Sequence, residues 1–598
     1  MMYTDDKNAQ VVLALLKQYG IKKVVVSPGM TNVPISRSVQ IDPWFEVYSV
    51  VDERSAAYFA CGLSYASGEP VVISCTGATA SRNYLPGLTE AYYRNLPIIA
   101  LTSQRHTSDY GNLVPQITDR TASQNDIKKV SVHLPVVRDD EDFERCTISV
   151  NKALIAATTR GNGPVHINLP VDDFSFTTDK LPEVRKITYY DSDSVKDEAT
   201  TLRSELKNKR VAVFIGAHAK FNKSLRRSVE NFAAQFGAAI IVDQTSNYMG
   251  KNAISLAQIA DLKNSSIKPD VVIDIGSITG EYSIGWLFNI ETWRISEDGE
   301  VHDRMHRQTK LFDCLEEVFF NALANKNEAV KINYYKELES EVATISVPEL
   351  PFSNTYVSHA LSKHLPKNSS IHMGILNSLR NMNFFALDDT IDGSSNVGGF
   401  GIDGALSTLI GQSMFDKKRL VFGLVGDLAA FYDMNALGIR HIGNNVRILI
   451  VNNCGGVEFR LNDEVERQLG EDTNEFIAAA GHNGSMKAWA EARGFYYMTA
   501  SDKEGFSKQI NDFCSPDLNK FKSPVVFEVF TTMENEQSSL REMHASNRAD
   551  NSSEELYGED SDVEYDTVIS RKDRLKAAMK RVAPESAKKI YKKMRDRD

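Results

Sequence analysis

The chain has 598 residues, of which 42% are hydrophobic and 25% charged, a composition typical of a globular protein with three or four domains. Its net charge of −11 argues against a general nucleic-acid binder, and six widely spaced cysteines without a CxxC pair argue against a disulfide framework or a thiolate zinc site. No apolar run approaches the ~18 residues that span a bilayer, and the opening MMYTDDKNAQ has no signal-peptide pattern, so we expect a cytoplasmic protein.

The first part of the chain predicts an α/β domain. Short β-branched runs alternate with Ala- and Leu-rich helical stretches, the pattern of a parallel sheet covered by helices. The predicted strands lie at 24–27, 70–75 and 97–103. A further strand in GPVHINLPVDD (163–173) is followed by an acidic, Pro-containing linker, and we place this domain at 1–180.

The same pattern recurs twice more. A central domain is predicted at 181–345 and a third domain at 346–546. Their predicted strands lie within 211–220, 238–244 and 269–277, and within 419–427, 446–453 and 524–530. We therefore expect an α/β protein with three doubly wound parallel-sheet domains, and we detect no internal sequence repeat.

The C-terminal extension, 547–598, differs in composition from the rest. It begins with an acidic, polar segment that predicts a flexible linker. Residues 570–598 contain 12 Lys and Arg against 4 Asp and Glu, with Pro584 between two helical patterns. A basic amphipathic helix can rest on an anionic membrane surface or bind an acidic protein, but it can also be a solvated helix or pack on its own dimer.

The most informative motif is Gly426-Asp427, followed after 24 residues by Asn452-Asn453-Cys454-Gly455. Each half ends a hydrophobic strand, so one strand–helix–strand unit places Asp427 and Asn453 together at the carboxyl edge of a parallel sheet. A carboxylate, an amide oxygen and a backbone carbonyl suit Mg²⁺ or Ca²⁺. The alternative is a helix-capping Asp and an unrelated Asn turn.

This motif resembles the diphosphate-binding motif of thiamine-diphosphate enzymes, and the N-terminal domain resembles their pyrimidine-binding domain. Four segments resemble the MenD family of menaquinone-pathway synthases, which join decarboxylated 2-oxoglutarate to isochorismate: SPGxxxxP, DER, GIDGALST and GDLAAFYDMNAL. The resemblance covers about residues 5–540. It implies pyrimidine-binding, central and diphosphate-binding domains, a homodimer or dimer of dimers, and thiamine diphosphate with Mg²⁺ (or Mn²⁺ or Ca²⁺) as cofactors.

The resemblance gives Glu53 of the DER segment the catalytic role. A carboxylate beside N1′ of the aminopyrimidine stabilises the imino tautomer, which removes the proton from C2 of the thiazolium ring. The alternative is a glutamate at a helix start, stabilised by the helix dipole.

Further cofactor-binding positions follow from the same resemblance. Asp427, Asn453 and Gly455 would hold the metal ion, and Ile402 would support the bent cofactor unless it is only a core residue. The remaining cofactor-binding positions are Asn377, Ser378, Gly426, Leu428 and Ala429.

The substrate positions depart from the family pattern. Arg105 and Gln116 match residues at the active-site mouth, although they could be ordinary surface residues, and Thr31 is a third predicted substrate position. The MenD-like pattern has Ser-Arg where this chain has Met30-Thr31, arginines where it has Met382 and Val397, and a lysine at Glu281. Since those basic residues would bind substrate carboxylates, their loss predicts a changed acceptor unless Arg380, Arg37 or Arg82 replaces them.

We therefore expect a thiamine-diphosphate-dependent enzyme that decarboxylates a 2-oxo acid and transfers the product to an unidentified acceptor. Three alternatives remain open: the menaquinone-pathway synthase activity itself, a simple 2-oxo acid decarboxylase, and an inactive scaffold recruited through its basic tail.

Overall fold

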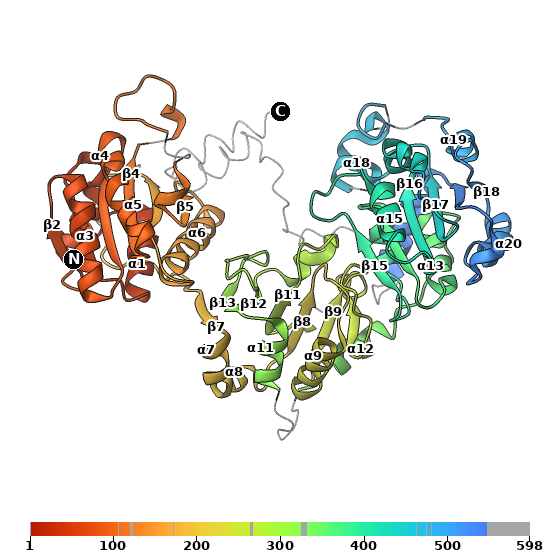
Figure 1. Ribbon diagram of the computed structural model, residues 1–598, viewed down its shortest axis with the longest axis horizontal. Helices are drawn as coiled ribbons and strands as arrows, with labels where there is room; N and C mark the ends of the chain where they lie inside the picture. The colour runs from red at the N-terminus through yellow and green to blue at the C-terminus, as the bar shows by residue number, and fades with distance from the viewer. Residues whose placement is uncertain are drawn as a thin grey trace, which may run out of the picture. The chain divides into compact units, whose positions relative to one another are not determined.

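The structure, a computed structural model, describes residues 2–546 except 106, 120–122, 172, 263–266, 325–331, 462, 474 and 480. It contains three parallel β-sheets with helices on their faces (Figure 1), which confirms the predicted α/β fold with three parallel-sheet domains. We call the parts built on these sheets the N-terminal, central and C-terminal domains. Their boundaries at residues 180 and 345 remain predictions, and the predicted linker and basic tail lie outside the described residues.

The N-terminal domain has a six-stranded sheet with the order β2-β1-β3-β4-β6-β5. Its strands are β1 (Lys23–Val26), β2 (Glu46–Ser49), β3 (Val71–Thr76), β4 (Ile98–Gln104), β5 (Val130–His133) and β6 (Val165–Pro170). Its helices are α1 (Lys7–Gln18), α2 (Val33–Ile41), α3 (Glu53–Ser67), α4 (Ala78–Asn83), α5 (Leu85–Tyr93) and α6 (Asp140–Thr158). One apolar core lies between the sheet and α1 with α6, and a second lies between the sheet and α3 with α5.

The central domain has a seven-stranded sheet with the order β10-β9-β8-β11-β12-β13-β7. Its strands are β7 (Thr188–Asp191), β8 (Val211–Ile215), β9 (Ala239–Val242), β10 (Ala253–Ser255), β11 (Val271–Ile275), β12 (Glu291–Ile295) and β13 (Gln308–Asp313). Its helices are α7 (Ser192–Asp197), α8 (Ala199–Leu206), α9 (Lys223–Phe236), α10 (Leu256–Ile259), α11 (Glu316–Leu323) and α12 (Tyr334–Val342).

The C-terminal domain has a six-stranded sheet with the order β15-β14-β16-β17-β19-β18. Its strands are β14 (Ser370–Met373), β15 (Asp392–Ser395), β16 (Val421–Gly426), β17 (Val446–Asn452), β18 (Tyr496–Ala500) and β19 (Val525–Phe530). Its helices are α13 (Asn354–His364), α14 (Asn377–Asn383), α15 (Ala405–Ser413), α16 (Asp427–Tyr432), α17 (Glu458–Leu461), α18 (Asp463–Leu469), α19 (Lys487–Ala492), α20 (Lys503–Phe513) and α21 (Met533–Ser546). Among the described residues, no helix is both long and apolar enough to cross a membrane.

The two outer sheets share one topology. When the strands of each domain are numbered in chain order, both sheets have the order 2-1-3-4-6-5. The sequence contains no repeat that reveals this relationship. Because parallel sheets are buried on both faces, many different apolar sequences satisfy the same strand positions.

Local sequence explains where several helices begin and end. Asp52 caps α3 by accepting a 2.7 Å hydrogen bond from the backbone N–H of Ser55, and α3 ends at Gly68 with φ of +71°. Asn222 caps α9 in the same way through the N–H of Leu225. These side chains satisfy backbone donors that have no partner inside the helix, and glycine adopts positive φ without strain.

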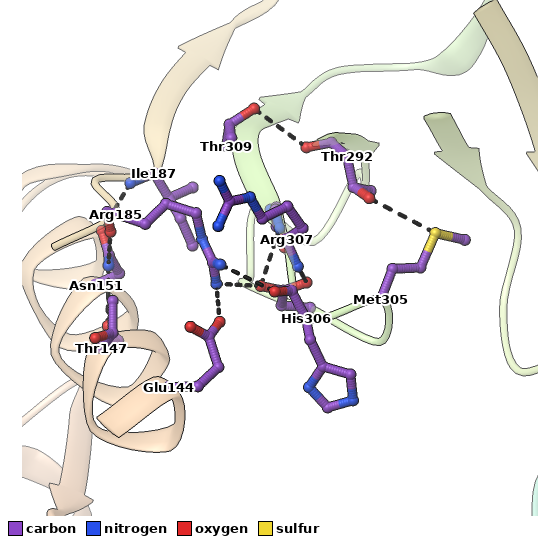
Figure 2. Close-up of polar contacts among 12 residues, drawn as sticks. Glu144, Thr147, Asn151, Arg185, Ile187, Thr292, Met305, His306, Arg307 and Thr309 are labelled. Atoms are coloured by element: carbon purple, nitrogen blue, oxygen red, sulfur yellow. Dashed lines mark hydrogen bonds and ion pairs between the residues drawn. The ribbon is translucent and has the colours of Figure 1, made fainter. Parts of the chain in front are cut away.

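The connection from the N-terminal to the central domain, at residues 185–187, makes hydrogen bonds and ion pairs with both domains (Figure 2). On α6, Asn151 accepts a 2.8 Å hydrogen bond from the N–H of Ile187 and donates one of 2.9 Å to the carbonyl of Arg185. The guanidinium of Arg185 pairs with Glu144 of α6 and with Asp303 of the central domain, the latter at 2.7 Å. Since the Asp303 side chain is fully buried, this pair is an internal tie between the two domains.

Candidate active site

The predicted metal residues meet at the ends of two neighbouring strands. β16 and β17 pair in parallel with Gly426 opposite Val451. Asp427 is the first residue of α16, and its buried carboxylate accepts hydrogen bonds from the backbone N–H groups of Leu428 at 2.7 Å and Gly455 at 3.0 Å. The strand–helix–strand geometry inferred from the motif spacing is therefore present.

Asn453 follows β17 and carries a hydrogen-bond acceptor without a partner in the part of the chain that the structure describes. We call Asp427, Asn453 and Gly455, at the ends of β16 and β17, the Asp427 corner. Asn453 is buried, and its Oδ1 atom has no hydrogen-bond partner among the described residues. Buried polar atoms are almost always paired, so an unpaired acceptor beside a buried carboxylate needs an explanation. A hard divalent cation, which binds carboxylate, amide and carbonyl oxygens, fits this donor set. Among the described residues, no group of three His, Cys, Asp or Glu side chains could hold a metal ion.

The charge of Asp427 is poorly stabilised without such a cation. Burial raises the pKa of this carboxyl group above its usual value, while the N–H groups of Leu428 and Gly455 and the side chain of His482 lower it by smaller amounts. The Nε2 atom of His482 lies 3.1 Å from Oδ2 of Asp427. The N–H of Gly484 donates to Nδ1 of the same ring, so Nε2 carries the proton and donates to the carboxylate.

The predicted diphosphate-contacting residues lie in helices that follow β14 and β16. Asn377 and Ser378 begin α14, which follows β14, and β14 pairs with β16 in parallel. Ser378 is buried, and Oδ1 of Asn377 is another buried atom with no hydrogen-bond partner in the described residues. Leu428 and Ala429 lie in the first turn of α16. These residues thus share one edge of the C-terminal sheet with the Asp427 corner.

Ile402 is half-buried and lies in the loop between β15 and α15. Gly404, the N-cap of α15, has φ of +76°, which turns the chain sharply just after this isoleucine. Its role beneath a cofactor stays a prediction.

Glu53 is the first residue of α3 in the N-terminal domain, and it is half-buried. The capping role belongs to Asp52, so the helix does not require the Glu53 side chain for its start. The nearby Tyr84 is fully buried. Burial raises the pKa of the Tyr84 hydroxyl well above its usual value, and the charge of Glu53 adds a smaller contribution.

The predicted substrate residues in the N-terminal domain fall into two environments. Thr31 is buried, donates a 2.9 Å hydrogen bond to the carbonyl of Ser103 and contacts the hydroxyl of Thr76, whereas its neighbour Met30 is 65% exposed. Arg105 and Gln116 are exposed and follow the end of β4. Their contact with a substrate remains a prediction.

The predicted substrate residues of the C-terminal domain lie in its apolar core. Met382 is fully buried and Val397 is 7% exposed, and both belong to one cluster with Leu379. A side chain at Gly280 of the central domain would collide with Leu379 and Val397, at 2.4 and 3.0 Å from its Cβ position. Met382 and Val397 therefore pack the domain interior in this structure, and a role beside a substrate is still only a prediction.

Polar contacts that the sequence did not reveal lie close to these positions. Glu281 is buried and accepts hydrogen bonds from Asn383 at 2.6 Å and from the N–H of Ser283 at 3.0 Å, and burial raises its pKa. Arg380 pairs with Glu458 at 2.6 Å, and its guanidinium lies 4.1 Å from the ring centre of Tyr282. No sequence pattern indicates the pairs of Glu281 with Asn383 and of Arg380 with Glu458, since each joins distant segments.

A cavity of about 500 Å³ lies in the N-terminal domain, and Tyr84 is one of the residues that line it. Residues of α4 and α5 line it together with Lys128 and His166. His166 is held by Thr102 at 2.7 Å and by Ser131 at 2.9 Å, which indicates a structural histidine.

Comparisons with known proteins agree with this geometry. Residues 6–131 match the family described as "Thiamine pyrophosphate enzyme, N-terminal TPP binding domain". The 2-succinyl-5-enolpyruvyl-6-hydroxy-3-cyclohexene-1-carboxylate synthase of Bacteroides fragilis is 33% identical over 566 residues, which cover 91% of this chain and 99% of the relative. The synthase of the same name from Bacteroides thetaiotaomicron is 32% identical over 562 residues (91% and 99%), and that of Flavobacterium johnsoniae is 27% identical over 560 residues (90% and 98%).

Proposed function

Because the chain belongs to the 2-succinyl-5-enolpyruvyl-6-hydroxy-3-cyclohexene-1-carboxylate synthase family of thiamine-diphosphate enzymes, we propose that it serves an acceptor different from that of its relatives. It is a thiamine-diphosphate-dependent enzyme that couples decarboxylation to carboligation, with a divalent metal ion as second cofactor. The observation that carries the proposal is the apolar, buried state of Met382 and Val397, where the MenD-like pattern has arginines.

The residues at the Asp427 corner suit both cofactors. Asp427, the unpaired Oδ1 of Asn453 and the carbonyl of Gly455 would bind the cation. Asn377 and Ser378, with the backbone of Gly426, Leu428 and Ala429, would hold the diphosphate, and Ile402 would support the rings. When bound, thiamine diphosphate supplies the electron sink on which decarboxylation of a 2-oxo acid depends.

Glu53 would act on the proton at N1′ of the aminopyrimidine. Its side chain is half-buried, and the helix that it begins is already capped by Asp52. This role requires a carboxylate that can exchange a proton with N1′, and the helix start does not use the Glu53 carboxylate.

The charge of the residues at the predicted substrate positions limits which acceptor can bind. A substrate carboxylate buried without a cationic partner costs several kcal/mol, enough to prevent binding. Met382 and Val397 offer no charge, and the buried Glu281 would repel an anion if ionised. An acceptor with fewer carboxylates than isochorismate fits this environment better.

A second candidate function is the synthase activity itself, and Arg380 favours it. Arg380 lies on α14, two residues before Met382. Its Nη2 atom donates a 2.6 Å hydrogen bond to Oε1 of Glu458. Oε2 of Glu458 is buried without a hydrogen-bond partner in the described residues, so the pair is incompletely satisfied. A substrate carboxylate that replaced Glu458 would gain a planar, bidentate donor.

The assembly we propose is a homodimer in which the N-terminal domain of one subunit supplies Glu53 to the cofactor of the other. Exposed apolar side chains on both outer domains support such an interface. In the N-terminal domain they include Val51 (72% exposed), Tyr58 (48%), Phe59 (43%) and Tyr65 (69%), and in the C-terminal domain Phe415 (94%) and Tyr432 (71%).

The test is a product assay with purified protein, Mg²⁺, thiamine diphosphate and a panel of 2-oxo acids with and without acceptors. The proposal predicts a ligation product with an acceptor other than isochorismate, and its absence in Glu53→Gln. An equal or higher rate with 2-oxoglutarate and isochorismate would instead support the synthase activity. Aldehyde as the sole product would indicate a simple decarboxylase, and cofactor binding without turnover would indicate a scaffold.

A further inference from the structure

We propose that Glu528 is a positioning residue that holds the cation-binding corner in shape. It touches neither the proposed cation ligands nor the substrate, and it acts through Asn452 and through the segment 482–486. This inference rests on the proposed cation ligands Asp427, Asn453 and Gly455.

Glu528 is a charged residue in an apolar place. It lies at the middle of β19, between Ile450 of β17 and Thr499 of β18, and it is fully buried. Its neighbours in the strand form the apolar run VVFEVF. Glutamate is almost never fully buried unless it is paired, so this position calls for partners that require a carboxylate.

Four donors satisfy the Glu528 carboxylate. Asn452 donates through Nδ2 to Oε1 at 2.8 Å, and the hydroxyls of Ser485 and Tyr497 donate to Oε2 at 2.6 and 2.7 Å. The N–H of Met486 lies 3.2 and 3.1 Å from the two oxygens. One carboxylate therefore joins three segments that are distant in the sequence.

Two paths of hydrogen bonds, which we call arms, lead from Glu528 to the proposed cation ligands. The first arm runs through Asn452 to the turn at residues 453–455. The Nδ2 of Asn452 also donates to the carbonyl of Gly484 at 2.9 Å, and its Oδ1 accepts a hydrogen bond from the N–H of Cys454 at 3.2 Å. That turn is unusual, because Cys454 has φ of +65° and Gly455 has φ of +158°. Non-glycine residues rarely adopt positive φ, so the Asn452 amide stabilises the conformation that presents Asn453 and the Gly455 carbonyl.

The second arm runs through Ser485 and Met486 to Asp427. These residues end the loop that begins with His482, whose Nε2 atom lies 3.1 Å from Oδ2 of Asp427. The N–H of Gly484 orients the ring by donating to Nδ1 at 3.2 Å. Both arms thus start at Glu528 and end beside the proposed cation ligands, an arrangement in which outer residues orient the inner ones.

The test compares Mg²⁺ affinity with stability in four full-length variants: Glu528→Gln, Asn452→Ala, their double variant, and Tyr497→Phe. Tyr497→Phe is the comparison variant: it removes one donor to the same carboxylate and a 3.5 Å contact with the Ser485 hydroxyl, and it leaves Asn452, Met486 and His482 in place. Mg²⁺ affinity is measured by calorimetry with saturating thiamine diphosphate, and Tm is measured on the cofactor-free protein.

Glu528→Gln and Asn452→Ala should each weaken Mg²⁺ binding by about 10- to 100-fold, the usual effect of losing an outer residue of a metal site. Tyr497→Phe should change the affinity less than about threefold at a comparable loss of Tm. The double variant should weaken Mg²⁺ binding by less than the product of the two single effects, because Glu528 and Asn452 share the first arm.

If Glu528→Gln and Tyr497→Phe weakened Mg²⁺ binding equally, Glu528 would contribute only to stability. That result would overturn the proposal. Multiplying effects in the double variant would do the same. If Glu528→Gln does not fold, Asn452→Ala decides alone, and unchanged affinity overturns the proposal. Failure of the unmutated protein to bind Mg²⁺ would instead overturn the cation site itself, which separates the two claims.

Discussion

The carboxylate of Asp427 accepts a 3.0 Å hydrogen bond from the backbone N–H of Gly455, 28 positions further along the chain. This bond joins the ends of β16 and β17, and Asn453, whose Oδ1 is unpaired in the described residues, directly follows β17. The proposed cation site is therefore built into the strand ends. It needs no rearrangement of the sheet to form.

Glu53→Gln should abolish most turnover while cofactor binding persists. The amide keeps the size of the side chain but cannot hold the proton at N1′, so turnover should fall by about 10²- to 10⁴-fold. Thiamine diphosphate affinity, measured by calorimetry, should change only a few-fold. Retained turnover would remove Glu53 from the mechanism.

Met382→Arg should destabilise the protein strongly. The side chain is fully buried in the C-terminal core, so an unpaired guanidinium there should cost more than about 3 kcal/mol of unfolding free energy. Met382→Leu keeps the volume and should cost less than about 1.5 kcal/mol. Denaturant unfolding gives both values. A stable Met382→Arg protein would show that this position opens toward a pocket and does not belong to the packed core.

Glu536 should make stability depend on pH. Burial raises its pKa from 4.5 to about 7, although Thr531 and the N–H of Asn354 lower it. The folded protein therefore binds this proton more tightly than the unfolded chain. The resulting stability is fully present below pH 4.5 and is lost as pH rises toward 7, by up to about 3 kcal/mol.

The measurement is unfolding free energy against pH, without added cations, for the unmutated protein and two variants. Glu536→Gln should remove most of the decrease between pH 4.5 and 7. Glu534→Gln, an exposed neighbour on α21, should leave the curve unchanged. Because the charge of Asp427 contributes to the Glu536 shift, the difference between the two variants' curves reports Glu536 together with that coupling. If the curves of unfolding free energy against pH for Glu536→Gln and the unmutated protein were parallel, the raised pKa of Glu536 would be wrong.

Arg185→Ala should lower stability through the tie between two domains. The Asp303 side chain is fully buried, and loss of its cationic partner should cost about 3 kcal/mol. Lys152→Ala is the matched control, because Lys152 and Glu300 join the same domains in an exposed pair at 3.2 Å worth at most about 1 kcal/mol. If both variants lost the same unfolding free energy in chemical denaturation, the pair of Arg185 with Asp303 would contribute no more than the exposed pair.

The fold class and the Asp427 corner could be predicted from the sequence because both depend on apolar strands and on the residues that follow them. Buried parallel strands are continuous apolar runs, so VFGLVG and VRILIVN stand out, and polar residues directly after them must lie at the carboxyl edge of the sheet. The placement of Asp427 beside Gly455 follows from that rule alone.

Other features could not be predicted because they depend on tertiary contacts. A glutamate inside VVFEVF indicates a buried, paired carboxylate, but nothing in the strand identifies Asn452 or Ser485 as its partners. Met382 and Arg380 lie on the same short helix, and the sequence does not tell which of them faces the core. The pair of Arg185 with Asp303 spans 118 positions and leaves no local pattern.

The most direct test of the account is a calorimetric titration of the purified full-length protein with thiamine diphosphate, with and without Mg²⁺, alongside Asp427→Ala. The account predicts saturable binding that requires Mg²⁺ in the unmutated protein and no detectable binding in Asp427→Ala. Absence of binding to the unmutated protein, or equal binding to Asp427→Ala, would contradict it.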